Sequence, residues 1–160
     1  AMICTGRAGS AFAAEIGTMK VAEEVDALVT MGLDPHRFLI VPKVLALMVV
    51  MPVLTLFGDI VGIAGGFLVG MNMLDIPMAA YYNETIFAMN FSHFAEGLIK
   101  SVIFAFLISA VGCRRGLETD GGAQGVGVAT TSAVVSGIFL VIIADTLMTW
   151  LFAAIDFGVV

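Results

Sequence analysis

The stretch VLALMVVMPVLTLFGDIVGIAGGFLVG, residues 44–70, decides the fold, because Asp59 is its only ionisable residue. A transmembrane helix needs about 20 predominantly apolar residues to cross the hydrocarbon core of a bilayer. Two further runs of that kind occur at 94–113 and 126–152. Of the 160 residues, 60% are hydrophobic and 12% are charged, about half the charged share of a soluble domain. We therefore expect an all-α, polytopic transmembrane protein.

The first 16 residues resemble the tail of another membrane helix. Small residues dominate them, and small residues let membrane helices approach one another closely. We interpret 1–16 as the end of a span whose beginning lies outside this sequence. The expected organisation is thus one transmembrane domain over 1–160, with three full spans and the end of a fourth.

The basic residues predict an orientation. Lys20, Arg37 and Lys43 lie in or beside the first connection, and Arg114 and Arg115 follow the span at 94–113. The connection at 71–93 contains no Lys or Arg. By the positive-inside rule, the segments at 15–43 and 113–125 face the cytoplasm, and the loop at 71–93 faces outward.

Several classes of function find no support in the sequence. The two cysteines, Cys4 and Cys113, form no CxxC pair, and His36 and His93 stand alone, so a metal site is not expected. The glycine-rich run GGAQGVG at 121–127 is not followed by Lys and is not a phosphate-binding loop. No nucleophile and base occur as a recognisable pair, and nothing suggests binding to nucleic acid.

The polar segment between the first two spans has the pattern of an amphipathic helix over 18–32. Thr18 can cap its start, and Gly32 followed by Pro35 predicts its end. One interpretation is a helix lying on the bilayer surface, but such helices usually carry Lys and Arg on the polar face. This one carries acidic residues, which favours a helix that docks on a cytoplasmic protein.

Two motifs resemble the MlaE/YrbE family, the permease subunits of MCE-type ABC lipid transporters. They are GRAGSAFAAEIGTMKVAEEVDALVTMGLDP at 6–35 and ETDGGAQGVGVATTSAVVSG at 118–137, and the likeness extends over the whole chain. The resemblance implies that the helix after the second span is a coupling helix seated on the ATPase. The residues implied for that contact are Glu15, Lys20, Val21, Glu23, Glu24, Val25, Leu28 and Met31.

The same resemblance implies the partners and the location. A dimer of this permease would sit in the bacterial inner membrane as a multi-pass protein, with a cytoplasmic ATPase that binds ATP and Mg²⁺. A periplasmic MCE-domain protein would exchange phospholipid with it. The chain itself would bind no cofactor and catalyse no covalent step.

Three charged residues, Asp59, Lys100 and Asp145, lie within predicted spans, where ionisable residues are functional candidates by default. At about 1.5 Å of rise per residue, Lys100 and Asp145 both lie about 10 Å from the outer ends of their helices and could meet. They could form a structural ion pair or line a lipid pocket, and the resemblance, whose pattern places a Lys and an Asp in these spans, favours the pocket. The aliphatic residues expected on the Asp145 face are Ile138, Val141 and Ile142.

The span at 44–70 also carries a glycine ridge, formed by Gly58, Gly62, Gly66 and Gly70. We expect it to pack against other spans of the same subunit. Two alternative functions remain at this point: a stand-alone proton-coupled secondary transporter, and a membrane scaffold without a transport role.

Overall fold

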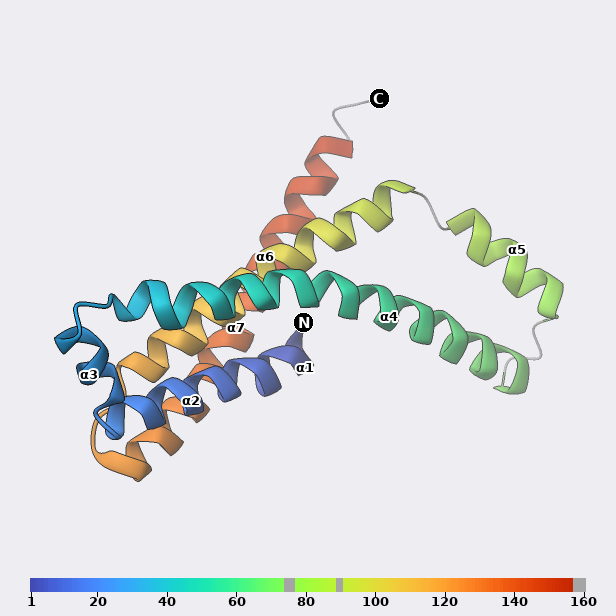
Figure 1. Ribbon diagram of the computed structural model, residues 1–160. Coiled ribbons are helices and arrows are strands. Elements are labelled where there is room, and N and C mark those ends of the chain that lie inside the picture. The colour runs from blue at the N-terminus through green and yellow to red at the C-terminus, as the bar shows by residue number, and fades with distance from the viewer. Residues whose placement is uncertain (74–76, 89–90, 157–160) are drawn as a thin grey trace.

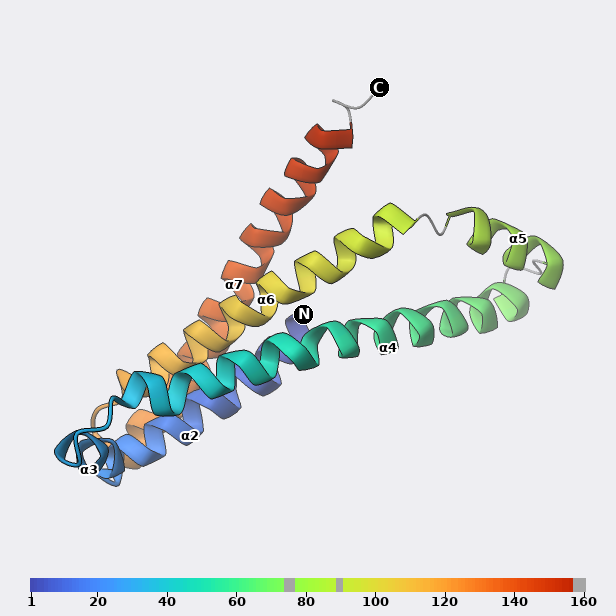
Figure 2. The same cartoon turned by 45° about the horizontal axis from the view of Figure 1, so that its top comes forward.

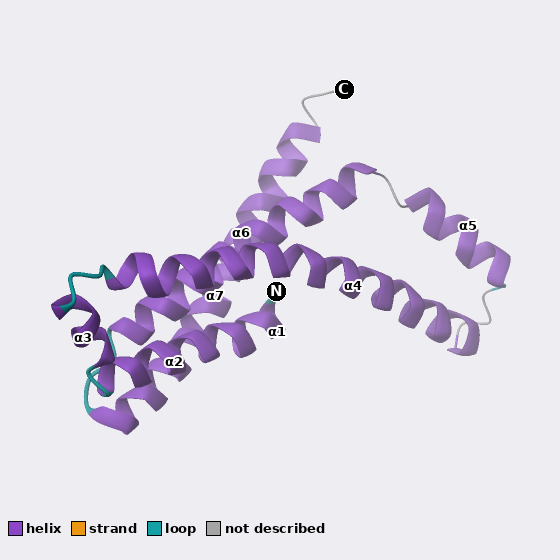
Figure 3. Cartoon of the chain, in the orientation of Figure 1, coloured by secondary structure: helices purple, strands orange, loops and turns teal. Residues whose placement is uncertain are grey.

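The computed structural model describes residues 1–73, 77–88 and 91–156, and in these residues the chain is helical and contains no strand (Figures 1 and 3). Within these described residues, three helices are long and apolar enough to cross a membrane: His36–Met71, Phe94–Leu117 and Gly122–Ala154. The predicted all-α, polytopic fold is therefore confirmed. Each spanning helix extends several residues beyond the apolar run that predicted it.

The chain begins with a continuous helical run made of α1 (Met2–Cys4), the π-helical turn η1 (Thr5–Gly9) and α2 (Ser10–Val21). A short helix, α3 (Glu24–Thr30), follows, and the π-helical turn η2 (His36–Ile40) leads directly into α4 (Val41–Met73). Beyond it come α5 (Met78–Ala88), α6 (Phe91–Leu117) and α7 (Gly122–Asp156). The predicted outer loop at 71–93 thus contains a helix of its own.

Four helices form a bundle at the end of the molecule that carries α3. There α2, the first half of α4, α6 and α7 pack side by side, whereas the second half of α4 and the end of α7 diverge from the bundle (Figures 1 and 2). The core of the bundle is made of apolar side chains from α4, α6 and α7. These are Leu47, Met51, Phe104, Ala105, Ile108 and Val141.

Glycines of α6 allow the helical run of η1 and α2 to approach it closely. A Cβ atom on Gly112 would lie 2.8 Å from the Gly9 carbonyl oxygen, and one on Gly116 would lie 2.8 Å from the Ile16 Cβ. The prediction for the glycine ridge of α4 is wrong at its first two positions, because a Cβ on Gly58 or Gly62 would meet nothing within 4 Å. Sequence spacing shows which glycines share a helix face, but not which face meets a neighbour.

Candidate functional site

The break between α2 and α3 lies later in the chain than predicted. Helix α2 continues through Thr18 to Val21. The Thr18 hydroxyl donates to the Ala14 carbonyl oxygen at 2.7 Å within this helix and caps nothing. The single helix expected over 18–32 is therefore wrong. A threonine can bond the carbonyl four residues before it as readily as it can cap a helix start, and the actual break occurs at Glu23, which has a φ of 60°.

The predicted end of α3 at Gly32 is confirmed. Gly32 has a φ of 75°, and the Leu33 N–H donates to the Leu28 carbonyl oxygen at 3.0 Å. This is the Schellman arrangement that closes a helix with a left-handed glycine. Asp34 then caps the next helical segment, because its carboxylate accepts the His36 N–H at 3.0 Å.

Helix α3 lies at the end of the bundle and exposes most of its surface (Figure 1). Val25 faces the protein and is 9% exposed, whereas Val29 and Met31 are 57% and 66% exposed. The carboxylates of Glu24 and Asp26 are on exposed residues of its first turn. The open surface of α3 thus combines apolar side chains with negative charge.

The residues that the resemblance assigned to ATPase contact fall into two groups. Val21, Glu23, Glu24 and Met31 are exposed, so they are free to meet a partner. The others are held by this chain. Val25 is buried, Leu28 is half-buried, and Glu15 forms an ion pair with Lys43 of α4, whose Nζ lies 5.5 Å from the centre of the Phe12 ring.

Lys20 also makes its contacts within the chain. Its Nζ donates to the Leu117 carbonyl oxygen at 2.7 Å and to the Asp120 carboxylate at 3.2 Å. Leu117 is the last residue of α6 and Asp120 lies in the connection to α7, so both partners are about a hundred positions further along the chain. Sequence reasoning missed them, because no local pattern links residues so far apart.

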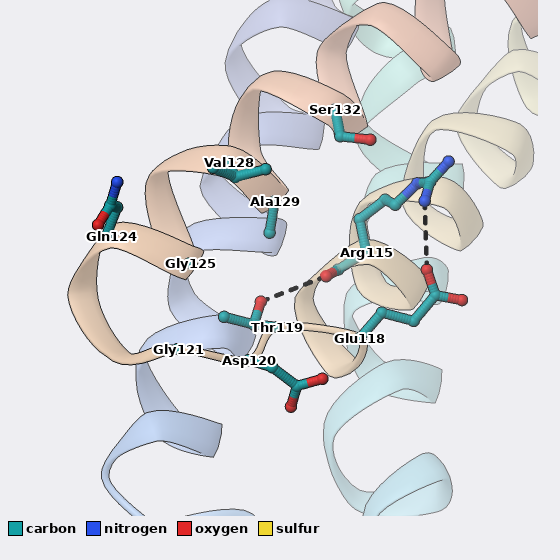
Figure 4. Close-up of a pocket in the computed structure, with 10 residues that line it drawn as sticks. All are labelled: Arg115, Glu118, Thr119, Asp120, Gly121, Gln124, Gly125, Val128, Ala129 and Ser132. Carbon is teal, nitrogen blue, oxygen red and sulfur yellow. Dashed lines mark hydrogen bonds and ion pairs between the residues drawn. The ribbon is translucent and has the colours of Figure 1, made fainter.

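The connection between α6 and α7 is shorter than the predicted loop at 114–125, since α6 ends at Leu117 and α7 begins at Gly122. It borders a pocket of about 500 Å³ (Figure 4). Within the connection, the Thr119 hydroxyl donates to the Arg115 carbonyl oxygen at 3.3 Å. The pKa of Glu118 is lowered, mainly because its carboxylate accepts a hydrogen bond from the Arg114 guanidinium. The polar side chains around this pocket are Arg115, Glu118, Thr119, Asp120, Gln124 and Ser132.

The two charged residues expected at one depth are in contact. The Lys100 Nζ lies 3.2 Å from the Asp145 carboxylate and donates to the Thr149 hydroxyl oxygen at 2.8 Å. The Lys100 side chain is 19% exposed and that of Asp145 is 55% exposed. Thr149 was missed by the sequence analysis, although it lies one helical turn after Asp145 on the same face. The three side chains form a polar cluster between two apolar helices.

The remaining candidates of the spans are not all near this cluster. Asp59 is exposed on α4 and pairs with no charged group among the described residues. Val141 is 2% exposed in the bundle core, so in this structure it presents no surface to a lipid, and its assignment to a lipid pocket stays a prediction. Consecutive residues of an α-helix point about 100° apart, so Val141 faces the core of the bundle while its neighbour Ile142 is 45% exposed. Ile138 is half-buried.

Comparison with known proteins gives consistent matches. The family described as Permease MlaE matches residues 1–151. A probable ABC transporter permease protein of Rickettsia prowazekii is 46% identical over 151 residues, which cover 94% of this chain and 58% of that protein. A probable ABC transporter permease protein of Synechocystis is 41% identical over 157 residues, covering 94% and 57%.

A plant protein is also similar. The Arabidopsis thaliana protein named TRIGALACTOSYLDIACYLGLYCEROL 1, chloroplastic, is 39% identical over 151 residues, which cover 94% of this chain and 43% of that protein. The chain thus spans about half the length of the curated relatives it matches.

Proposed function

This chain belongs to the MlaE permease family, and from that membership we propose that it is the membrane subunit of an ATP-driven ABC transporter for phospholipids. In this proposal it sits in the bacterial inner membrane as part of a permease dimer. A cytoplasmic ATPase subunit binds ATP and Mg²⁺, and a periplasmic MCE-domain protein delivers or receives the lipid.

The observation that carries the proposal is the exposed surface of α3. This helix has seven residues, is capped at its end and is anchored mainly through Val25. It presents Val29 and Met31 outward, which is the form of a docking element. Its acidic first turn disfavours contact with anionic lipid head groups and suits a protein groove with a basic rim. The basic residues Arg37, Lys43, Arg114 and Arg115 belong to segments at the same end of the bundle, as expected for the cytoplasmic side.

The lipid substrate has separate support. The name of the Arabidopsis relative contains that of a galactolipid, which supports a lipid as the transported class. In this chain the Lys100–Asp145–Thr149 cluster offers a cation and an open carboxylate between apolar helices. A lipid head group would meet the polar side chains while its acyl chains follow exposed aliphatic residues such as Ile142.

The proposed mechanism is mechanical. ATP binding closes the ATPase dimer and brings the two α3 helices of the permease dimer together. That motion repacks the spans and changes the access of a lipid to the surface around Lys100 and Asp145. This chain supplies binding and movement, and the partner subunit hydrolyses ATP.

The test is co-purification of the ATPase with the full-length membrane protein. The variant Val29→Glu/Met31→Glu adds charge to the open surface of α3 without disturbing the buried Val25. We expect the parent to retain the ATPase and the variant to retain at least about tenfold less, as for loss of central interface residues. The control is Gln124→Glu, which adds a negative charge at the exposed start of α7.

Absence of an ATPase from the parent preparation would overturn the proposal. The Lys100–Asp145 ion pair would then favour the second candidate, a proton-coupled secondary transporter. Equal retention by the parent and the α3 variant would show instead that the ATPase docks elsewhere.

A further inference from the structure

Lys20 ties the last turn of α2 to the ends of two spanning helices. Its Nζ donates to the Leu117 carbonyl oxygen, one of the final carbonyls of α6, at 2.7 Å. It also lies 3.2 Å from the Asp120 carboxylate, two residues before α7 begins. The Lys20 side chain is 33% exposed and that of Asp120 is 89% exposed. Because an exposed ion pair contributes little, the bond to the α6 terminus is the stronger part of the contact.

Close packing holds the same connection against α2. Thr119 is 3% exposed, and a Cβ on Gly17 of α2 would lie 2.8 Å from its hydroxyl oxygen. A Cβ on Gly125 would lie 1.9 Å from the Asp120 carbonyl oxygen, so the connection also folds tightly onto the first turn of α7. The end of α2, the end of α6 and the start of α7 therefore form one packed unit, the α2–α6–α7 junction.

Helix α3 is joined to this junction by a bend. Ala22 and Glu23 separate α2 from α3, and Glu23 adopts the left-handed conformation with a φ of 60°. A residue with a side chain is uncommon in that region and costs free energy there. Lys20 lies in the helical turn directly before the bend. Any displacement of α3 therefore reaches the end of α2 at the position where Lys20 contacts α6.

The junction also connects to the polar cluster of the spans. Helix α6 runs from the junction to Lys100, and α7 runs from it to Asp145, where the two helices are joined by the 3.2 Å ion pair. A change in how the two helices meet at the junction alters their spacing at the other contact, because helices are rigid over such lengths.

We propose that Lys20 is a positioning residue that transmits the movement of α3 to α6 and α7. It acts through the Leu117 carbonyl and the packed junction, and it is not itself part of the ATPase-binding surface. This inference rests on the proposed function, since the movement of α3 is the one that an ATPase would drive.

The experiment compares Lys20→Met with the parent in the full-length protein assembled with its ATPase. Phospholipid transfer and ATP hydrolysis are measured in vesicles of phosphatidylethanolamine and phosphatidylglycerol, and co-purified ATPase is scored in parallel. We expect Lys20→Met to keep the ATPase and its hydrolysis but to lower lipid transferred per ATP at least about fivefold, the low end of usual coupling. Lys20→Arg, which can still donate to Leu117, should restore the ratio.

Arg114→Met is the matched control, because it removes a cation from the same end of α6 without breaking a contact to α2. An unchanged ratio in Lys20→Met, or an equal fall in Arg114→Met, would overturn the positioning role. Loss of ATPase from Lys20→Met alone would also overturn it and would make Lys20 a docking residue. If Lys20→Met does not accumulate in the membrane, Lys20→Gln takes its place. Equal lipid transfer per ATP in Lys20→Gln and Arg114→Met would then overturn the positioning role.

A parent protein that brings down no ATPase would overturn the proposed function, and the positioning role with it. If the parent couples ATP hydrolysis to lipid transfer and Lys20→Met transfers as much lipid per ATP, the positioning role alone would be overturned. The two failures are therefore distinguishable within one set of preparations.

Discussion

The Lys100 ammonium of α6 lies 3.2 Å from the Asp145 carboxylate of α7, and it also donates to the Thr149 hydroxyl. The pair joins the two spanning helices beyond the bundle core, where α7 begins to diverge. Pairing lowers the cost of placing each charge in a span. More than half of the Asp145 side chain nevertheless remains open. The carboxylate can therefore accept a further donor, which a closed structural ion pair would not allow.

Replacing one member of this ion pair should lower the abundance of the protein in the membrane more than replacing both. We expect Lys100→Met alone to lower membrane abundance, because an unpaired charge in a span costs about 2.5–3.5 kcal/mol on insertion scales. Lys100→Met/Asp145→Asn should restore abundance but not phospholipid transfer. Abundance in membranes and lipid transfer by the purified complex are the two measurements. Normal transfer by the double variant would show that the pair serves only helix packing.

The glycine contact between η1 and α6 should be intolerant of a side chain. Gly112→Ala places a Cβ 2.8 Å from the Gly9 carbonyl oxygen, and overpacking of this kind costs about 1–3 kcal/mol. We expect a lower melting temperature in detergent. Gly58→Ala on α4 is the control and should leave the melting temperature unchanged, since its Cβ meets nothing within 4 Å. A decrease for Gly58→Ala would reveal that another chain covers that surface of α4.

The end of α3 should depend on the glycine at position 32. Gly32 has a φ of 75°, and a residue with a Cβ in that conformation costs about 1–2 kcal/mol. Gly32→Ala should therefore increase the rate of amide hydrogen exchange in α3 and weaken ATPase retention. Gly6→Ala introduces a Cβ with nothing within 4 Å and should change neither quantity. Unchanged exchange in Gly32→Ala would mean that α3 does not need this termination.

The hydroxyl of Tyr81 should hold α5 against α4. It donates to the Ile63 carbonyl oxygen at 2.9 Å, and its ring packs edge-to-face with that of Phe67, with 5.4 Å between the ring centres. Tyr81→Phe keeps the ring and removes the hydrogen bond, which contributes about 1 kcal/mol. Faster hydrogen exchange in α5 is expected. Tyr82→Phe is the matched control on a residue that is 64% exposed, and exchange that is equally fast in both variants would contradict the assignment.

Glu118 should contribute stability that depends on pH. Its pKa is lowered in the folded protein, mainly by the hydrogen bond from Arg114. A carboxyl group with a lowered pKa stabilises the folded state above its unfolded value of about 4.3. That contribution is lost as the pH falls through the folded value. A carboxyl carbon titration by NMR should place the Glu118 midpoint at a lower pH in the parent than in Arg114→Met. A Glu118 midpoint that is the same in the parent and in Arg114→Met would contradict this prediction.

Part of the site was predictable from local pattern. Gly32 ends α3 because a helix is commonly closed by a glycine in the left-handed conformation. The sequence shows this signal as a glycine followed three residues later by Pro35. The contact between Lys100 and Asp145 was predictable from depth, since two charges at one level of a bilayer favour each other over lipid. The start of α3 was not predictable from Thr18, whose hydroxyl had a partner available within the preceding helix.

By itself, the sequence determined that the protein is helical, that three of its helices are long and apolar enough to span a membrane, and where α3 ends. These properties follow from composition, run length and a single backbone requirement, all of which are local. Only the tertiary structure decided that Lys20 meets Leu117, that Glu15 meets Lys43, and that Gly112 packs while Gly58 does not. Helical periodicity fixes which residues share a face, whereas the choice of neighbour depends on how whole helices pack together.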